Sequence, residues 1–182
     1  MEKKNVELPI FGNVELDDID ITDYKYQYYE AYPGKFDLGE LSVDFDVHFE
    51  ELRDDYINSV HLALDNREKL NQIATAAYIA DYESGGETSD YIQNWQDDIF
   101  GQIFSAEEFA SFIVGTNEDM PLGKWLLSLL RLVRIGIYAG GAESFIVMDY
   151  AFGDDYDKGF RDDMLVVKMN EKYEVEAIVG EG

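Results

Sequence analysis

Aspartates crowd the stretch from Asp149 to Asp163, DYAFGDDYDKGFRDD, which overlaps the end of the apolar run FIVMDY. Carboxylate oxygens are the ligands that Ca²⁺ and Mg²⁺ prefer in proteins. The stretch could therefore hold a cation, with Asp154, Asp155 and Asp157 as its candidate ligands. The alternative is a solvated connection between two strands, because glycine and aspartate are common turn residues.

The spacing of a known calcium-binding loop does not fit this stretch. An EF-hand needs oxygen ligands at positions 1, 3 and 5, glycine at position 6 and glutamate at position 12. Setting Gly159 at position 6 places Tyr156 at position 3 and Lys158 at position 5. Position 12 is then Leu165, and Arg161 adds positive charge nearby. We therefore favour the solvated connection and expect no metal or cofactor, while an irregular carboxylate site stays open.

Other catalytic residue types are scarce. The chain has no cysteine and two histidines, His48 and His61. This excludes disulfides, cysteine-ligated zinc, iron–sulfur clusters and a cysteine nucleophile. The motifs H-E-x-x-H, G-x-S-x-G and G-x-x-x-x-G-K-[ST] are absent, and Gly140-Gly141 is better explained as a hairpin turn. We therefore expect a protein that is not an enzyme.

Negative charge dominates the composition. The formal net charge is −25, from 39 acidic and 14 basic residues. Such a surface repels phosphate groups, so we expect neither nucleic-acid nor anionic-membrane binding. The same charge would steer a basic partner protein toward the chain.

The chain shows no targeting or membrane-spanning pattern. Its start, MEKKNVELPIFG, has no apolar core like that of a signal peptide. The most apolar run, from Trp125 to Tyr138, is shorter than a membrane span and contains Arg131 and Arg134. Together with the absence of cysteine, these features predict a cytoplasmic protein with one domain over residues 1–182.

Strand patterns occupy both ends of the chain and helical patterns its middle. Residues 24–49 alternate as a hairpin, with a turn at Pro33-Gly34 and a bulge at Gly39-Glu40. Val6 to Leu16 is broken by Pro9 and Gly12 and predicts at best an edge or bulged strand. The last third predicts a meander of strands, at residues 130–138, 144–152, 164–169 and 173–179.

Helical spacing of apolar residues begins at Leu52 and breaks at Asp65-Asn66. Gly85-Gly86 ends the next helix, Ser89 is the expected N-cap of the following one, and Ser105 opens a capping box. The predicted fold class is α+β, with a mostly antiparallel sheet formed by an N-terminal hairpin and a C-terminal meander. A central block of four or five helices would cover one face of that sheet.

The hairpin supplies the sharpest candidate recognition residues. Tyr24, Tyr26, Tyr28 and Tyr32 share one face of a strand, and tyrosine is frequent on recognition surfaces. The alternative, which we favour, is an aromatic row packed within the sheet. On the other arm, Leu41, Val43 and Phe45 alternate with acidic positions that include Asp44 and Asp46, which predicts one buried face and one wet acidic face.

The order of these segments resembles an uncharacterised bacterial family filed as domain of unknown function two-thousand-and-four. The resemblance rests on LPIFG near the start, the central helices, and the ending LRLVRIGIY, FIVMDY and MLVVKMN. Asp149-Tyr150 corresponds to an Asp-Tyr pair that ends a strand in such relatives, and the Leu-Val-Val strand follows as residues 165–167. The resemblance implies a fold and a bacterial origin and carries over no active site.

Three functions remain open from the sequence. The first is a non-enzymatic protein-binding module, with an immunity or antitoxin-like inhibitor of a basic toxin as its concrete form. Its partner-binding residues would be Tyr24, Tyr26, Tyr28, Asp44 and Asp46. The second is a carboxylate-based, metal-dependent enzyme or small-ligand binder, and the third is a structural or regulatory oligomerisation module.

Overall fold

The computed structural model of the protein describes residues 3–17, 26–32, 36–45, 53–100, 120–140, 144–152 and 163–181. These residues form an α+β fold, which confirms the predicted class. The strands are β1 (Lys3–Leu8), β2 (Gly12–Asp17), β3 (Tyr26–Tyr32), β4 (Phe36–Phe45), β5 (Arg131–Ala139), β6 (Ile146–Ala151), β7 (Met164–Met169) and β8 (Val175–Glu181). The helices of the described residues are α1 (Asp54–Asp65), α2 (Arg67–Ser84), α3 (Glu87–Phe100) and α5 (Leu122–Leu129).

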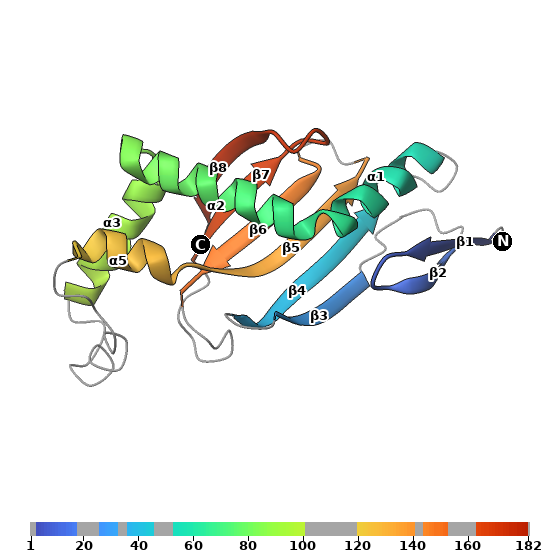
Figure 1. Ribbon diagram of the computed structural model, residues 1–182, viewed down its shortest axis with the longest axis horizontal. Coiled ribbons are helices and arrows are strands. Elements are labelled where there is room, and N and C mark those ends of the chain that lie inside the picture. The colour runs from blue at the N-terminus through green and yellow to red at the C-terminus, as the bar shows by residue number, and fades with distance from the viewer. Residues whose placement is uncertain are drawn as a thin grey trace.

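The main sheet joins segments from both ends of the chain. Its strand order is β3-β4-β5-β6-β7-β8, and every neighbouring pair is antiparallel except β4 and β5. The predicted union of an N-terminal hairpin with a C-terminal meander is therefore present, but its junction is parallel (Figure 1). A parallel pair needs a long crossover connection, and the chain between β4 and β5, with its helices, supplies one.

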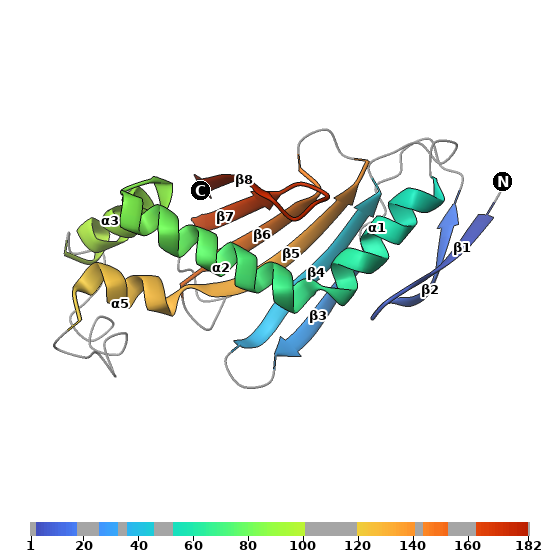
Figure 2. The same cartoon turned by 45° about the horizontal axis from the view of Figure 1, so that its top comes forward.

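One face of this sheet carries the core. Across β4 and β5, Leu41 is paired with Ile135 and Val43 with Ile137, and all four are buried. The row continues into β6, where Met148 pairs with Ile135. Helices α1 and α2 lie across this face (Figure 2). Because strand residues alternate between faces, the burial of Val43 confirms the predicted phase of β4.

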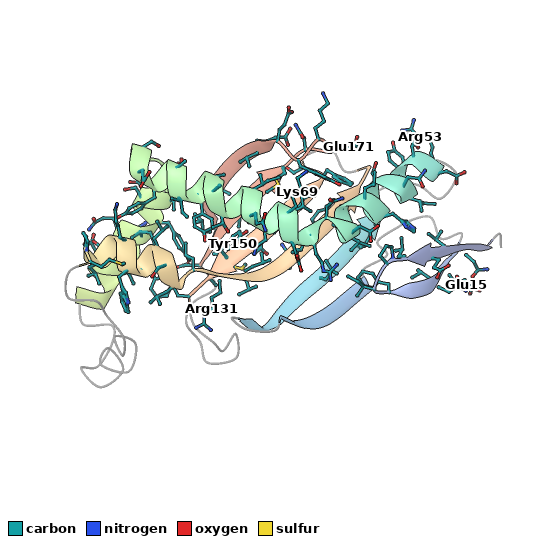
Figure 3. The ribbon with its side chains drawn as sticks, in the orientation of Figure 1. Glu15, Arg53, Lys69, Arg131, Tyr150 and Glu171 are labelled. Atoms are coloured by element: carbon teal, nitrogen blue, oxygen red, sulfur yellow. The ribbon has the colours of Figure 1, made fainter. Side chains whose placement is uncertain are left out.

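Tyr150 connects the centre of the sheet to α2 (Figure 3). Its side chain is almost fully buried, and its hydroxyl donates a hydrogen bond of 2.8 Å to Oδ1 of Asn71. Its ring also meets the ring of Tyr78 edge-on, with 5.0 Å between the centroids. A buried tyrosine needs such a polar partner, because an unpaired hydroxyl in the core would be destabilising. These contacts fix α2 over β6.

The helix boundaries follow local chemistry, with one correction to the sequence prediction. Asn66 separates α1 from α2, and Gly85 ends α2 with a left-handed φ of 77°, both as the sequence predicts. Ser89, however, is not the N-cap of α3, because that helix begins at Glu87. The carboxylate of Asp81, from the end of α2, instead accepts a hydrogen bond of 2.7 Å from the backbone N–H of Thr88. A side chain from the preceding helix thus accepts a hydrogen bond from a free backbone N–H group at the start of α3, as an N-cap side chain would.

Two strand details also differ from the sequence prediction. Residues 3–17 form a complete hairpin and not one broken strand, since β1 pairs with β2 around a turn at Pro9, Ile10 and Phe11. Pro9, which lies in this turn, and Gly12, the first residue of β2, are the two residues that predicted a weak strand. The bulge expected at Gly39-Glu40 lies between Phe36 and Gly39, where the pairing of β3 and β4 shifts by one residue.

Several sequence predictions concern residues outside the described ranges. The turn at Pro33-Gly34 and the helix opened by Ser105 are among them, so the expected number of four or five helices stays a prediction. No helix in the described ranges is both long and apolar enough to cross a membrane.

Replacing Ile137 by alanine should test the buried row of the sheet. Ile137 is 1% exposed between Val43 and Ile146, so its truncation leaves a cavity and should lower the unfolding free energy by about 2–5 kcal/mol. Urea unfolding followed by circular dichroism measures the change. Leu62→Ala is the matched control, because Leu62 is 58% exposed and its truncation should change stability by less than about 0.5 kcal/mol. Equal effects would contradict the assigned core face.

Candidate functional site

Most of the sequence-predicted site residues lie where no side-chain description is possible. Asp154, Asp155 and Asp157, the candidate metal ligands, fall outside the described residues, as do Tyr24 and Asp46. Within the described part of the chain, no group of three or more His, Asp or Glu side chains could hold a metal ion. The preference for a solvated loop over a cation site therefore stays a prediction.

The strand register places the remaining predicted residues on opposite faces. Tyr26 pairs with Val43 and Tyr28 with Leu41, and directly paired residues share one face of a sheet. Positions 26 and 28 thus lie on the face that carries the core, and the choice between a packed aromatic row and a recognition surface stays a prediction. Asp44 pairs with Tyr138 on the other face. The partner-binding role of these residues stays a prediction.

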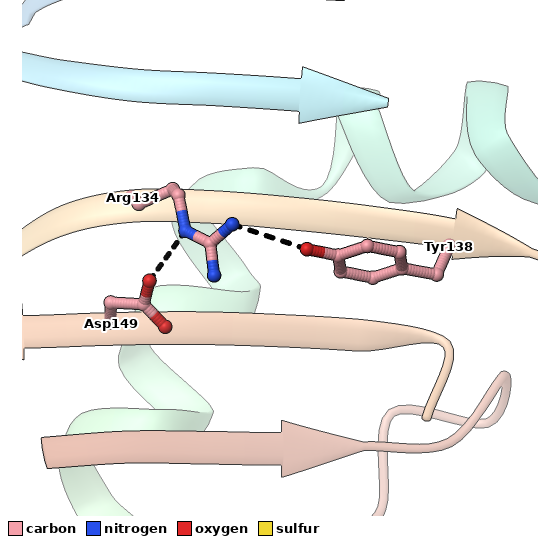
Figure 4. A network of polar contacts seen from close by, with 3 residues as sticks. All are labelled: Arg134, Tyr138 and Asp149. Atoms are coloured by element: carbon pink, nitrogen blue, oxygen red, sulfur yellow. Dashed lines mark hydrogen bonds and ion pairs between the residues drawn. The ribbon is translucent and has the colours of Figure 1, made fainter. Parts of the chain in front are cut away.

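A polar network occupies the face opposite the helices. In Figure 4, Arg134, Tyr138 and Asp149 lie in front of the sheet and the helices lie behind it. Arg134, on β5, donates from Nε to Oδ2 of Asp149 on β6 and from Nη1 to the hydroxyl of Tyr138 at 3.1 Å. Asp149 is 1% exposed, and its Oδ1 accepts no hydrogen bond. The network holds the guanidinium of Arg134 in one position across two strands.

Gly136 makes room for this network. Residues 134, 136 and 138 lie on the same face of β5, because side chains alternate along a strand. A Cβ at position 136 would lie 2.7 Å from Cε2 of the Tyr138 ring. The ring of Tyr138 therefore covers the glycine and reaches back along the strand to Arg134. The pattern Arg-x-Gly-x-Tyr in β5 is the sequence signal of this packing, and it was not recognised as such from the sequence.

Burial dominates the protonation of the Asp149 carboxyl. Removal from water raises its pKa, and the hydrogen bond and positive charge of Arg134 offset only part of this effect. Burial lowers the pKa of Arg134, but the hydrogen bond and charge of Asp149 outweigh it, so the guanidinium stays charged. The cost of removing Asp149 from water offsets much of its attraction to Arg134, so this ion pair is expected to add little to the stability of the fold.

A cleft of about 260 Å³ lies between α3 and the end of β8. Its lining residues are Glu87, Asp90, Tyr91, Asn94, Trp95, Asp163, Gly180 and Glu181. The contributions from α3 are spaced three or four residues apart, which places them on one side of that helix. The described residues thus line the cleft with four carboxylates and two aromatic side chains, and none of these described lining residues is basic.

Aromatic packing fixes the floor of this cleft. Tyr91 stacks on Phe152, with 5.8 Å between ring centroids, and Trp95 meets the same ring edge-on at 4.7 Å. The Tyr91 hydroxyl donates to the backbone oxygen of Asp163 at 3.1 Å. Burial, with a smaller contribution from the charge of Asp163, raises the pKa of Tyr91, so this phenol stays protonated. At the rim, Glu181 forms an ion pair of 2.8 Å with Lys168.

A second hollow, of about 390 Å³, separates α2 from α5. It is mostly apolar, with Tyr78, Ile79, Tyr82, Met120 and Leu127 among its lining residues. Ile79 and Met120 are 39% and 41% exposed. Its described charged groups, Lys124 and Glu83, form an exposed ion pair of 4.0 Å.

Sequence reasoning missed the acidic cleft because its walls come from three distant segments. Helical spacing indicates that Glu87, Asp90 and Asn94 share one side of α3. No local pattern indicates that Asp163 and Glu181 join them, since their approach depends on where α3 crosses β8. No protein family, curated protein or solved structure matches the chain, so the family resemblance stays an expectation.

The packing of Tyr138 on Gly136 can be tested by a double-mutant cycle. Tyr138→Phe should lower stability by about 0.5–1.5 kcal/mol in the natural chain, because the bond to Arg134 is lost. In a Gly136→Ala background the same change should cost much less, since the new methyl group already displaces the ring. Chemical unfolding measures all four free energies. Tyr56→Phe, on α1, is the control and should cost the same in both backgrounds.

The stability contributed by Asp149 should decrease as the pH rises. Because the folded chain binds this proton more tightly than the unfolded chain, the contribution is fully present below the unfolded pKa of about 3.9 and is lost at higher pH. The unfolding free energies of the natural chain and of Asp149→Asn, measured from pH 3.5 upward, give the difference directly. An increase of the difference with pH would contradict the assignment.

Proposed function

We propose that this chain is a non-enzymatic protein-binding module whose partner is a basic protein. The observation that carries the proposal is the cleft between α3 and β8, with four carboxylates and two aromatic rings along its walls. In a chain of net charge −25, this cleft is lined by four carboxylates, whereas the hollow between α2 and α5 is lined by one carboxylate and one lysine. A lysine or arginine side chain of a partner has the charge and the length to enter it.

The geometry suits a cationic side chain better than a metal ion. Glu87 and Asp90 are exposed at the start of α3, and the described carboxylates of the cleft do not form a group that could ligate a metal. A guanidinium or ammonium group needs only nearby negative charge, and aromatic rings add favourable contact with its stem and its charge. The tyrosine and tryptophan are buried in the floor, so they are already held in place before a partner arrives.

This location differs from the one expected on the sheet. The described side chains of the open face include Arg134 and Lys168, which pair with Asp149 and Glu181. Charge on that part of the face is therefore nearly balanced. In the cleft, Glu181 is the same residue that pairs with Lys168, while Glu87 and Asp90 add two exposed carboxylates at the start of α3. These two carboxylates make the cleft the better point of contact for a cationic surface. Long-range attraction from the whole chain would speed the encounter, and contacts in the cleft would then select the partner.

The most concrete form of the proposal is an inhibitor that covers a basic toxin, such as a nuclease, in the manner of an immunity protein or antitoxin. A nuclease binds phosphate with a basic surface, so an acidic protein competes for the same surface. This form is supported by the net charge and by the acidic cleft, and it requires no catalytic group in this chain.

Affinity capture at low salt tests the proposal. The tagged chain should retain a basic protein from a lysate of the organism that encodes it, identified by mass spectrometry and then purified. Its dissociation constant should rise about 5- to 30-fold for Glu87→Gln with Asp90→Asn, which corresponds to about 1–2 kcal/mol for two partly desolvated contacts. Titration calorimetry measures the change.

The control removes the same charge elsewhere. Glu7→Gln with Glu68→Gln changes two exposed carboxylates outside the cleft and should weaken binding less than twofold. Thermal unfolding of both double variants checks that loss of acidic residues from the first turn of α3 has not unfolded the helix. Failure to retain any basic protein, or equal weakening by the two double variants, would refute the proposal.

A further inference from the structure

Strand β8 is an edge of the main sheet. Its strand neighbour in the described structure is β7, and nothing in the described residues pairs with its other side. Among the described residues, the backbone hydrogen bonds outside helices and sheets include none from residues 175–181. Alternate backbone N–H and C=O groups of an edge strand point away from the sheet, where they can pair with an added strand.

The strand is poorly protected against such pairing. Proteins commonly blunt a sheet edge with proline, with inward-pointing charge or with a bulge. In β8 the pairing with β7 shifts near Val175, and from Ala177 to Glu181 it is regular. Ala177, Ile178 and Val179 are half-buried and apolar. Within the described residues, the outer side of this regular run from Ala177 to Glu181 is therefore open to pairing.

The same strand leads into the acidic cleft. Gly180 and Glu181, its last two residues, line the cleft together with Glu87 and Asp90 of α3. A Cβ built on Gly180 would lie 3.6 Å from the ring of Tyr91, so α3 passes close to the end of β8. An extended segment laid along β8 would therefore bring one of its side chains to the mouth of the cleft.

We propose that β8 binds an extended, basic segment of a partner protein as an additional strand, with one lysine or arginine side chain in the cleft. Main-chain hydrogen bonds would supply affinity and the cleft would supply selectivity, as in other cases of strand addition. The inference rests on the proposed function and specifies how the basic partner is recognised.

Charge distinguishes this occupant from a second copy of the chain. Two copies joined edge to edge would bring together two bodies that each carry a net charge of −25. Strand β8 itself also carries two carboxylates, Glu176 and Glu181. Like charges facing each other across strands are destabilising. A cationic strand meets attraction at the same positions.

Synthetic peptides separate strand addition from simple charge attraction. The first probe is a blocked, fluorescent nine-residue peptide in which lysine alternates with valine. In the second, every valine is replaced by proline, which keeps the charge and removes the backbone donors that a strand needs. A peptide of alternating glutamate and valine controls for apolar contact. Fluorescence anisotropy at low salt measures binding to the full chain, and amide hydrogen exchange locates it.

We expect the lysine–valine peptide to bind at least about tenfold more tightly than the lysine–proline peptide, and the glutamate–valine peptide not to bind. Hydrogen exchange should slow at alternate residues of β8, and the Glu87→Gln, Asp90→Asn double variant should weaken binding more than the Glu7→Gln, Glu68→Gln control. Equal binding of both lysine peptides, or protection at β3 in place of β8, would overturn strand addition and leave the proposed function standing. If neither lysine peptide binds, strand addition is overturned, and the capture experiment decides the proposed function separately.

Discussion

The whole arrangement depends on the parallel pairing of β4 with β5. This contact brings a strand from the first quarter of the chain against one from the last third, and it aligns Leu41 with Ile135 and Val43 with Ile137. The aligned side chains form one continuous apolar row that continues into β6. Helices α1 and α2 lie across this row, which is built from both ends of the chain, and its burial from water is the main stabilising contribution.

Because one face of the sheet carries the apolar core, the intervening side chains of each strand lie on the opposite face. Side chains alternate along each strand, so Arg134 and Tyr138 of β5 and Asp149 of β6 point away from the helices (Figure 4). There the sheet keeps a paired arginine and aspartate, with Gly136 leaving room for the tyrosine ring. This network ties two neighbouring strands together, and nothing in it resembles a reacting centre. Its physical role is to orient side chains on the open face.

Negative charge, by contrast, is concentrated where the helical layer meets the sheet edge. Glu87 and Asp90 of α3 are exposed on the side of the helix that faces the end of β8, and Tyr91 and Trp95 of the same helix pack on Phe152. The result is a hollow with a rigid apolar floor and carboxylates on its walls, next to a sheet edge. Those two features together distinguish this place from an ordinary solvated acidic surface.

The sequence by itself determined most of the elements of the main sheet and the phase of β4. Alternation placed Val43 inward, and the segment MLVVKM predicted β7 over its full length. Asn66 and Gly85 marked helix ends. Such features depend on local periodicity and backbone preference, which the sequence shows directly. Local signals misplaced the cap of α3, since Asp81 reaches it from the preceding helix. Only the tertiary structure decided the parallel junction and the meeting of Glu87, Asp163 and Glu181 in one cleft. Those contacts join residues far apart in the chain, and no local pattern records which distant segments will pack together.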